Sequence, residues 1–139
     1  MDRSRNRSTG DGKIIHELYY DTWVVILLDE VDRWYLDLAE TDPATADLVT
    51  AAIDLLAESG PALGRPAVDS ITGSQVHNLR ELRASTIRVL FAFDPQRRAV
   101  LLVAGDKAGS WASWYTTNVP VAERRYAAWL AGEYDYERH

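Results

Sequence analysis

The most informative part of this sequence for the fold is HNLRELRASTIRVLFAFDPQRRAVLLVAGDKAG, residues 77–109. Long runs of apolar and β-branched residues are separated in it by short polar segments, which is typical of consecutive β-strands. ASTI predicts one tight turn and DPQRR another, with Pro95 at its second position because proline fixes the φ angle needed there. We therefore predict an antiparallel meander of three strands, Val76–Arg83, Ile87–Phe93 and Ala99–Val103.

The residues before this stretch predict a strand followed by two helices. Residues 16–28 are rich in aromatic and β-branched side chains, which favours a strand. Residues 30–40 space their apolar side chains as in a helix, at Val31, Trp34, Tyr35 and Leu38. The next helix begins with Asp42 as N-cap and Pro43 in the first turn, and it ends at Gly60-Pro61. Its expected buried stripe is Leu48, Val49, Ala52, Ile53 and Leu56.

The remaining segments complete an α+β pattern. A short strand is expected at Val68–Ile71, an exposed excursion over 105–118, and a closing helix over 119–134 with Pro120 near its start. The apolar face of that helix is expected to be Ala122, Tyr126, Trp129 and Leu130. This order of elements favours a small antiparallel sheet with helices packed on it. Residues 1–12 lack apolar periodicity and predict a disordered leader, so that 13–139 form a single domain.

The composition excludes several kinds of site. The 139 residues include no cysteine, which rules out disulfides, thiolate nucleophiles and zinc–thiolate centres. The three histidines, at positions 16, 77 and 139, lack ligand spacing, so we expect no metal and no cofactor. No run approaches the roughly 20 apolar residues that cross a bilayer, and the polar start does not resemble a secretory signal. We therefore expect a cytoplasmic protein that has no membrane partner.

Charge is distributed unevenly along the chain. The net charge is −6, yet residues 11–62 carry twelve Asp or Glu against two Lys or Arg, whereas residues 63–110 carry four acids against seven bases. Binding partners contact local patches, so the distribution is more informative than the total. The sequence therefore predicts an acidic helical half and a basic sheet face.

Three cations of the basic segment are expected to converge. Arg83 and Arg88 flank the ASTI turn, and Lys107 follows the next strand. One interpretation is structural: the two arginines pair with Glu81 and Asp94, and Lys107 is a solvated turn residue. The other is a phosphate site, because guanidinium groups bind phosphate oxygens in pairs and lysine adds a compact charge. Spacing by itself slightly favours the structural interpretation.

A phosphate site of this composition suits RNA cleavage. The 2′-hydroxyl can attack its own 3′-phosphate without a metal, provided that it is oriented and that the charge of the phosphorane is stabilised. The Tyr115 hydroxyl is a candidate to reach the scissile phosphate, and Trp111 and Trp114 could stack bases, although aromatic residues are as often core. His77 is a candidate general base, although a histidine entering a strand is more often structural. Arg65, also in the basic segment, is included among the RNA-binding candidates with Arg80, His77 and Trp114.

The motifs of the middle and C-terminal regions also resemble a known family. LGRP, HNLRELR, IRVLFAFDP and LLVAGDKAGSWASWY occur in an order and spacing that resemble the HigB/RelE-like toxins of bacterial type II toxin–antitoxin systems, in the phage-derived HigB-like branch. The resemblance covers about residues 20–130. It implies a RelE-like fold and a ribosome-dependent endoribonuclease that cleaves mRNA and thereby inhibits translation. A helix-turn-helix antitoxin would hold it inactive, and operator DNA would be contacted only through that antitoxin.

The resemblance also implies roles for individual residues. Arg83, Arg88 and Lys107 match the active-site cations of the family, Tyr115 matches less strongly, and Arg80 stands where relatives commonly have lysine. The connection between Arg83 and Arg88 is shorter than is usual in this branch, which could displace one arginine from the other. Two alternatives therefore stay open: a catalytically silent module of the same fold that binds the antitoxin and modulates operator binding, and a small phage-derived structural protein that assembles through a tryptophan-rich surface.

Overall fold

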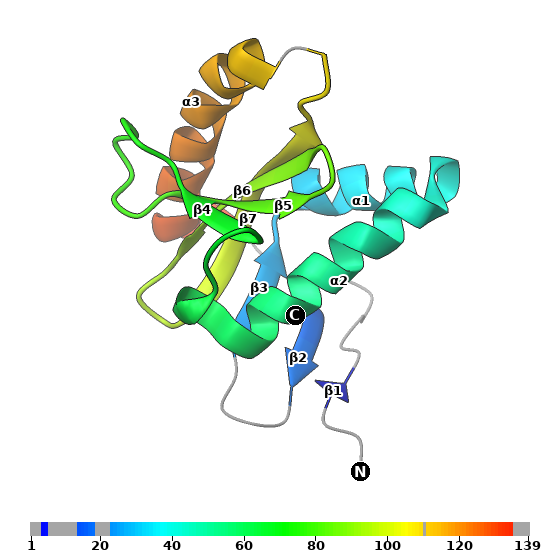
Figure 1. Cartoon of the computed structure of the whole chain (residues 1–139). Helices are drawn as coiled ribbons and strands as arrows, with labels where there is room; N and C mark the ends of the chain where they lie inside the picture. Colours follow the sequence, from blue (N-terminus) through cyan, green and yellow to red (C-terminus); the bar gives the residue numbers. More distant parts are fainter. Residues whose placement is uncertain (1–3, 6–13, 19–22, 110, 135–139) are drawn as a thin grey trace.

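The computed structural model describes residues 4–5, 14–18, 23–109 and 111–134, with side chains over the last two ranges. The seven strands form one sheet in the order β1-β2-β3-β7-β6-β5-β4 (Figure 1). Their bounds are β1 Ser4–Arg5, β2 Ile14–Leu18, β3 Val24–Leu27, β4 Val68–Ser70, β5 Arg80–Ala84, β6 Ile87–Phe93 and β7 Arg98–Asp106. Apart from Ser4–Arg5, the expected leader over 1–12 lies outside the described residues, so its disorder stays a prediction.

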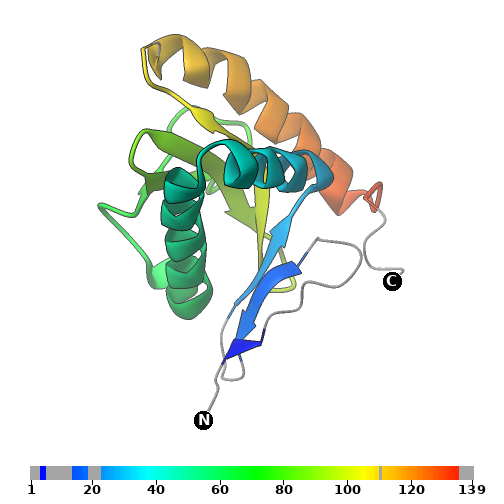
Figure 2. The same cartoon turned by 90° about the vertical axis from the view of Figure 1, so that its right-hand side faces the viewer.

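Helices cover both faces of the sheet. α1 (Asp29–Thr41) and α2 (Pro43–Ser59) lie on one face, and α3 (Trp111–Leu130) lies on the other (Figures 1 and 2). Two hydrophobic cores result, one between the sheet and α1–α2 and one between the sheet and α3. The predicted α+β class is confirmed. The sheet is mixed, however, because β3 pairs in parallel with β7 after the two helices have carried the chain across the face.

The start of α2 is as predicted, but its buried stripe differs. The Asp42 carboxylate caps the helix by accepting from the Thr45 backbone N–H at 3.2 Å, and Pro43 occupies the first turn. Leu48 was expected in the core and is 51% exposed. The buried positions are instead Ala46, Val49, Ala52, Ile53, Leu56 and Ala57. The apolar surface of α2 is therefore wider than the sheet can cover.

Three strand predictions need correction. Residues 16–28 contribute to two strands, β2 and β3, which pair antiparallel, so a single strand there is wrong. β5 begins at Arg80 and not at Val76, because the chain turns just before it, with Asn78 at a positive φ of 65°. β7 is longer than the predicted Ala99–Val103 and continues to Asp106. The β6 bounds are those expected.

A β-bulge in β7 determines which side chains face α3. The register with β6 shifts between Leu90 and Phe91, whose partners are Val103 and Leu101. Leu102 is the extra residue, and Arg125 of α3 donates to its carbonyl oxygen at 2.8 Å. Beyond a bulge the alternation of side chains is inverted. Gly105, the partner of Arg88, therefore faces α3.

Helix α3 begins earlier than the sequence indicates. Residues 105–118 were expected to be an exposed excursion, yet the helix starts at Trp111 and Pro120 lies inside it. Proline removes one helical hydrogen bond, at a cost of about 3 kcal/mol, and the packing of Trp114, Tyr115 and Val119 on the second core can offset this. Leu130, expected on the buried face, is 54% exposed. In the described part of the chain, no helix is long and apolar enough to span a membrane.

We predict that Gly105→Ala destabilises the protein by about 1–3 kcal/mol, the usual cost of overpacking. A Cβ at this position would lie 2.6 Å from Nε1 of Trp114, so the indole would have to move. Thermal unfolding would measure the loss. Gly64→Ala is the matched control, since a Cβ there meets nothing within 4 Å. Equal melting temperatures for the two variants would contradict the close contact between Gly105 and Trp114.

Candidate active site

The β5–β6 hairpin brings two arginines together. Its strands are joined by Ser85 and Thr86 alone, with Ser85 at a positive φ of 57°, as tight hairpin turns require. Arg83 and Arg88 are Cα partners across the hairpin and therefore share a face of the sheet, the one that α3 covers. The short connection thus does not displace one arginine from the other; it sets them opposite each other.

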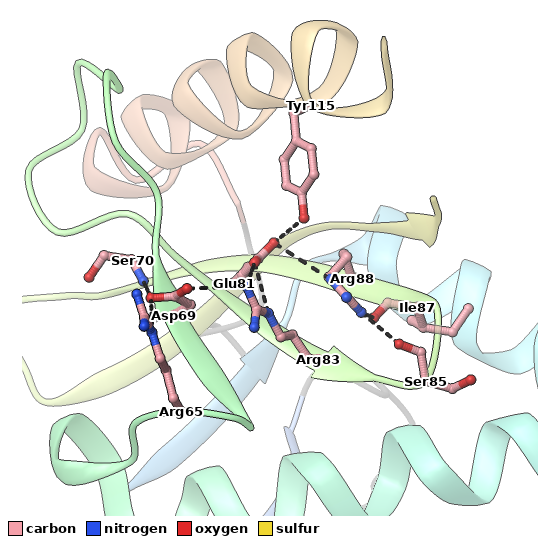
Figure 3. A network of polar contacts seen from close by, with 9 residues as sticks. All are labelled: Arg65, Asp69, Ser70, Glu81, Arg83, Ser85, Ile87, Arg88 and Tyr115. Carbon is pink, nitrogen blue, oxygen red and sulfur yellow. Dashed lines mark hydrogen bonds and ion pairs between the residues drawn. The ribbon is translucent and has the colours of Figure 1, made fainter. Parts of the chain in front are cut away.

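A buried carboxylate joins these arginines. Glu81 is 4% exposed, and its Oε2 accepts from Nε of Arg83 at 2.9 Å, while its Oε1 lies 3.8 Å from Nε of Arg88 (Figure 3). Nη2 of Arg83 also contacts Asp69 of β4 at 3.1 Å. The hydrogen bond to Glu81 raises the pKa of Arg83 above its ordinary value, so this guanidinium stays charged.

Arg88 is held rigidly but is incompletely bonded. Its Nη1 donates to the carbonyl oxygens of Ser85 at 2.7 Å and Ile87 at 2.9 Å, which fixes the plane of the guanidinium. Its Nε is buried and has no hydrogen-bond partner among the described residues. Buried polar groups are nearly always paired, so an unpaired donor here indicates a place for a further acceptor.

Tyr115 of α3 closes the site from the other side. Its hydroxyl donates to Oε1 of Glu81 (Figure 3). Burial is the largest cause that raises the Tyr115 pKa to about 12, followed by the hydrogen bond and charge of Glu81, while Arg88 acts in the opposite direction. Tyr115 is therefore a neutral hydrogen-bond donor at physiological pH.

The structural interpretation of the arginines is correct in part. Arg83 does pair with Glu81, but the expected partner of Arg88, Asp94, lies at the opposite end of β6 and is bonded to Arg98 at 2.8 Å. Arg65 pairs with Asp69 at 3.2 Å and so borders the group. We call Arg65, Arg83 and Arg88 the arginine cluster. Its three cations face two carboxylates, Glu81 and Asp69, which leaves one formal positive charge.

Lys107 and Trp111 form a second, adjoining pair. Lys107 follows β7 two residues beyond Gly105, the partner of Arg88, and its backbone N–H donates to Thr86 at 3.1 Å. Its ammonium lies 5.5 Å from the centre of the Trp111 ring, and within the described residues it makes no ion pair. Lys107 is therefore a partly buried cation beside an indole and not a freely solvated turn residue.

The other predicted RNA-binding residues lie apart from the cluster. Arg80 points to the α2 face, where it donates to the Pro61 carbonyl at 3.1 Å and lies over Phe93. His77 is exposed in the turn before β5, not in a strand. Trp114 is half-buried and packs on Gly105. Of the five tryptophans, all in the described residues, Trp111 alone is exposed, at 61%, so a tryptophan-rich surface is not present.

Sequence reasoning missed the central position of Glu81, which it treated only as a neighbouring acid. The signal available was its alternation with Arg83 on one strand face. Nothing in the sequence pointed to the contact between Glu81 and Tyr115, 34 residues apart. Among the described residues no group of three or more His, Cys, Asp or Glu is arranged to hold a metal ion.

A pocket of about 260 Å³ lies at the other end of the sheet, beside the β6–β7 turn. Asp94, one of its lining residues, is buried and accepts from the Gln96 and Arg98 backbone N–H groups, from Nε of Arg98 and from Nε1 of Trp129. Because its carboxylate is already well satisfied, Asp94 is better explained as a structural cap of the turn than as a ligand-binding group.

Comparisons with known proteins show which family this chain belongs to. Residues 36–127 match the family described as phage derived protein Gp49-like (DUF891). The chain is 52% identical over 112 residues to the candidate toxin HigB3 of Mycobacterium tuberculosis, covering 79% of this chain and 96% of that protein. It is 46% identical over 107 residues to the candidate toxin HigB2 of the same organism, covering 73% of this chain and 53% of that longer protein. The resemblance to HigB-like toxins is thereby confirmed, and the chain belongs to the Gp49-like family of phage-derived proteins.

Proposed function

We propose that this HigB-like toxin is an endoribonuclease that cleaves mRNA on the ribosome, and that a cognate helix-turn-helix antitoxin restrains it. Translation would be inhibited because messages are cut while they are being read. The protein would act in the cytoplasm, without a cofactor or a catalytic metal, and it would reach operator DNA only through the antitoxin. The proposed active-site residues are Arg83, Arg88, Lys107 and Tyr115.

One observation carries this proposal: two guanidinium groups on adjacent strands converge on a single buried anion, with one buried N–H still unpaired. A carboxylate and a phosphate both present oxygens to guanidinium donors, and paired hydrogen bonds to them are strong. A phosphodiester that displaced Glu81 would meet Arg83, the free Nε of Arg88 and the Tyr115 hydroxyl. We therefore propose that a phosphate binds at the position that the Glu81 carboxylate occupies.

The reaction that these groups can support is internal transesterification. The 2′-oxygen forms a bond to phosphorus, the bond from phosphorus to the 5′-oxygen breaks, and the products are a 2′,3′-cyclic phosphate and a 5′-hydroxyl. The 2′-hydroxyl loses a proton and the leaving oxygen gains one. Arg83 and Arg88 would stabilise the added negative charge of the phosphorane. Neutral Tyr115 is placed to donate a proton or a hydrogen bond to the leaving oxygen.

Residues around Arg83, Arg88 and Tyr115 would bind the RNA on either side of the scissile phosphate. Arg65 is 78% exposed at its side chain and lies on the same side as Arg83 through their shared partner Asp69, so it suits a phosphate contact. Lys107 lies at the turn end of the same hairpin, on the side of β7, where its backbone N–H donates to the carbonyl oxygen of Thr86. A contact through Arg80 would belong to a separate surface, since it faces α2. His77 and Trp114 stay candidates for RNA binding.

We predict that Trp111→Ala weakens RNA binding by about 5- to 150-fold, because one stacked base is worth about 1–3 kcal/mol. The ring is 61% exposed and is supported edge-on by Tyr115, with centroids 6.3 Å apart. Affinity for a short single-stranded RNA, measured by fluorescence anisotropy at fixed salt, would test this. Trp111→Phe should keep most of the affinity. If the alanine variant binds as tightly as the unmodified protein, no RNA base stacks on Trp111.

A catalytically silent antitoxin-binding module is the second candidate. It is favoured by Glu81 and Asp69, which already neutralise much of the charge of Arg83. Under this alternative the arginine cluster is a structural network that holds β4, β5 and β6 together. The chain would then bind its antitoxin and alter operator binding without cutting RNA.

A cleavage assay with purified protein and translating ribosomes distinguishes the endoribonuclease from the silent antitoxin-binding module. We expect cuts that leave 2′,3′-cyclic phosphate and 5′-hydroxyl ends, detected by enzymes that ligate or label only such ends. Products with 3′-hydroxyl ends would contradict attack by the 2′-hydroxyl. No cleavage, combined with tight antitoxin binding, would favour the silent module.

A further inference from the structure

The outer face of α2 is unusually apolar for a surface that carries this much negative charge. Leu48 and Leu55 are 51% and 41% exposed, and they lie seven residues apart, two helical turns along one side. Ala44 and Ala51, also exposed, continue the same side. The opposite side of α2 is already buried in the first core. We call Ala44, Leu48, Ala51 and Leu55 the α2 stripe.

Carboxylates flank this stripe. Asp47 and Glu58 are exposed on α2 and make no ion pair with any other described residue. Residues 29–59, which form α1 and α2, contain nine acids and a single base, Arg33. Leucines bordered by unpaired carboxylates are complementary to an amphipathic helix that presents its own apolar residues between lysines and arginines.

The same charges argue against other occupants. A second copy of the chain docked through this face would bring two acidic helices together, which like-charge repulsion disfavours. RNA and anionic lipid are repelled for the same reason. The occupant that fits is a basic polypeptide.

We propose that the α2 stripe is the docking surface for a basic amphipathic helix of the cognate antitoxin. This inference rests on the proposed function, which supplies the antitoxin as partner. Because α2 and α3 lie on opposite faces of the sheet (Figure 2), a helix bound here does not cover Arg83, Arg88 or Tyr115. Inhibition from this side would act by preventing entry into the ribosome and not by filling the arginine cluster.

The test uses the full chain and the antitoxin encoded beside it. We expect the double variant Leu48→Lys with Leu55→Lys to bind the antitoxin at least 100-fold more weakly by calorimetric titration, because the central apolar contacts of an interface dominate its affinity. The variant should still arrest growth, and the antitoxin should no longer relieve that arrest. Lysine is a good helix former, so α2 should persist. Leu36→Lys on α1, where the leucine is 55% exposed outside the stripe, is the matched control and should stay neutralised.

A second double variant, Asp47→Asn with Glu58→Gln, keeps the shape of α2 and tests the contribution of the two negative charges. It should weaken antitoxin binding by about 10-fold at low salt and less at high salt. Unchanged affinity in both double variants would overturn the docking proposal, as would a self-associating chain that becomes monomeric in the lysine variant while still binding the antitoxin. A chain that never arrests growth would refute the proposed function instead, and the titration would still decide whether α2 is the docking surface.

Discussion

Arg88→Ala should reduce mRNA cleavage on the ribosome by about 100- to 1000-fold, which is the usual cost of removing one preorganised donor to a developing negative charge. Arg88 is 12% exposed at its side chain, is fixed by two carbonyl oxygens, and carries the unpaired buried Nε. No rotation of Arg83 can replace it, because Arg83 is already bonded to Glu81 and Asp69. Single-turnover cleavage rates on ribosome-bound mRNA would measure the effect.

Two variants control this result. Arg88→Lys keeps the charge but loses the planar guanidinium group with its paired donors, so we expect a cleavage rate between those of the unmodified protein and Arg88→Ala. Arg65→Ala removes an exposed cation at the edge of the cluster and should weaken RNA binding mainly, with a smaller effect on the rate of bound substrate. Circular dichroism and thermal unfolding would establish that Arg88→Ala remains folded. Full cleavage by a folded Arg88→Ala protein would remove Arg88 from the mechanism.

Glu81→Gln should lower the stability of the protein by about 3 kcal/mol, because removing one partner of a buried ion pair leaves the other charge uncompensated. Arg83 and Arg88 would then face each other across the hairpin with their common carboxylate neutralised. For a domain of this size the melting temperature should fall by about 10 °C. Differential scanning calorimetry would record it. Asp69→Asn should cost less, since that side chain is 24% exposed and pairs with Arg83 from the edge strand.

The Glu81→Gln variant should also bind RNA more tightly if Glu81 competes with phosphate for Arg83 and Arg88. Affinity for a short RNA should rise as stability falls, which is a combination that a purely structural salt bridge does not predict. Comparing the cleavage rate with the affinity then shows whether Glu81 has a chemical role: tighter binding with slower cleavage would mean that the carboxylate also accepts a proton. A variant that is less stable and binds RNA no better would show that Glu81 is structural only.

Much of the sheet was predictable because its signals are local. A run of apolar and β-branched residues between two turn signals identified β6. The tight ASTI turn indicated that Arg83 and Arg88 could stand side by side, which their pairing confirms. The cap of α2 was equally local, since Asp42 and Pro43 act on their immediate neighbours. The acidic helices and the basic strands followed from counting charges by segment.

The surroundings of these arginines depend on contacts between elements that are far apart in the sequence. A one-residue bulge at Leu102, stabilised by Arg125 from a different element, turns Gly105 toward α3, where Trp114 packs on it. The start of α3 at Trp111 depends on packing that outweighs the proline inside the helix, and it is this start that brings Tyr115 to Glu81. The sequence was sufficient to predict β6, the turns on either side of it and the two facing cations, because each depends on residues a few positions apart. The closing of the site over Glu81 and the exposure of Leu48 depend on how separate elements pack, which no local pattern encodes.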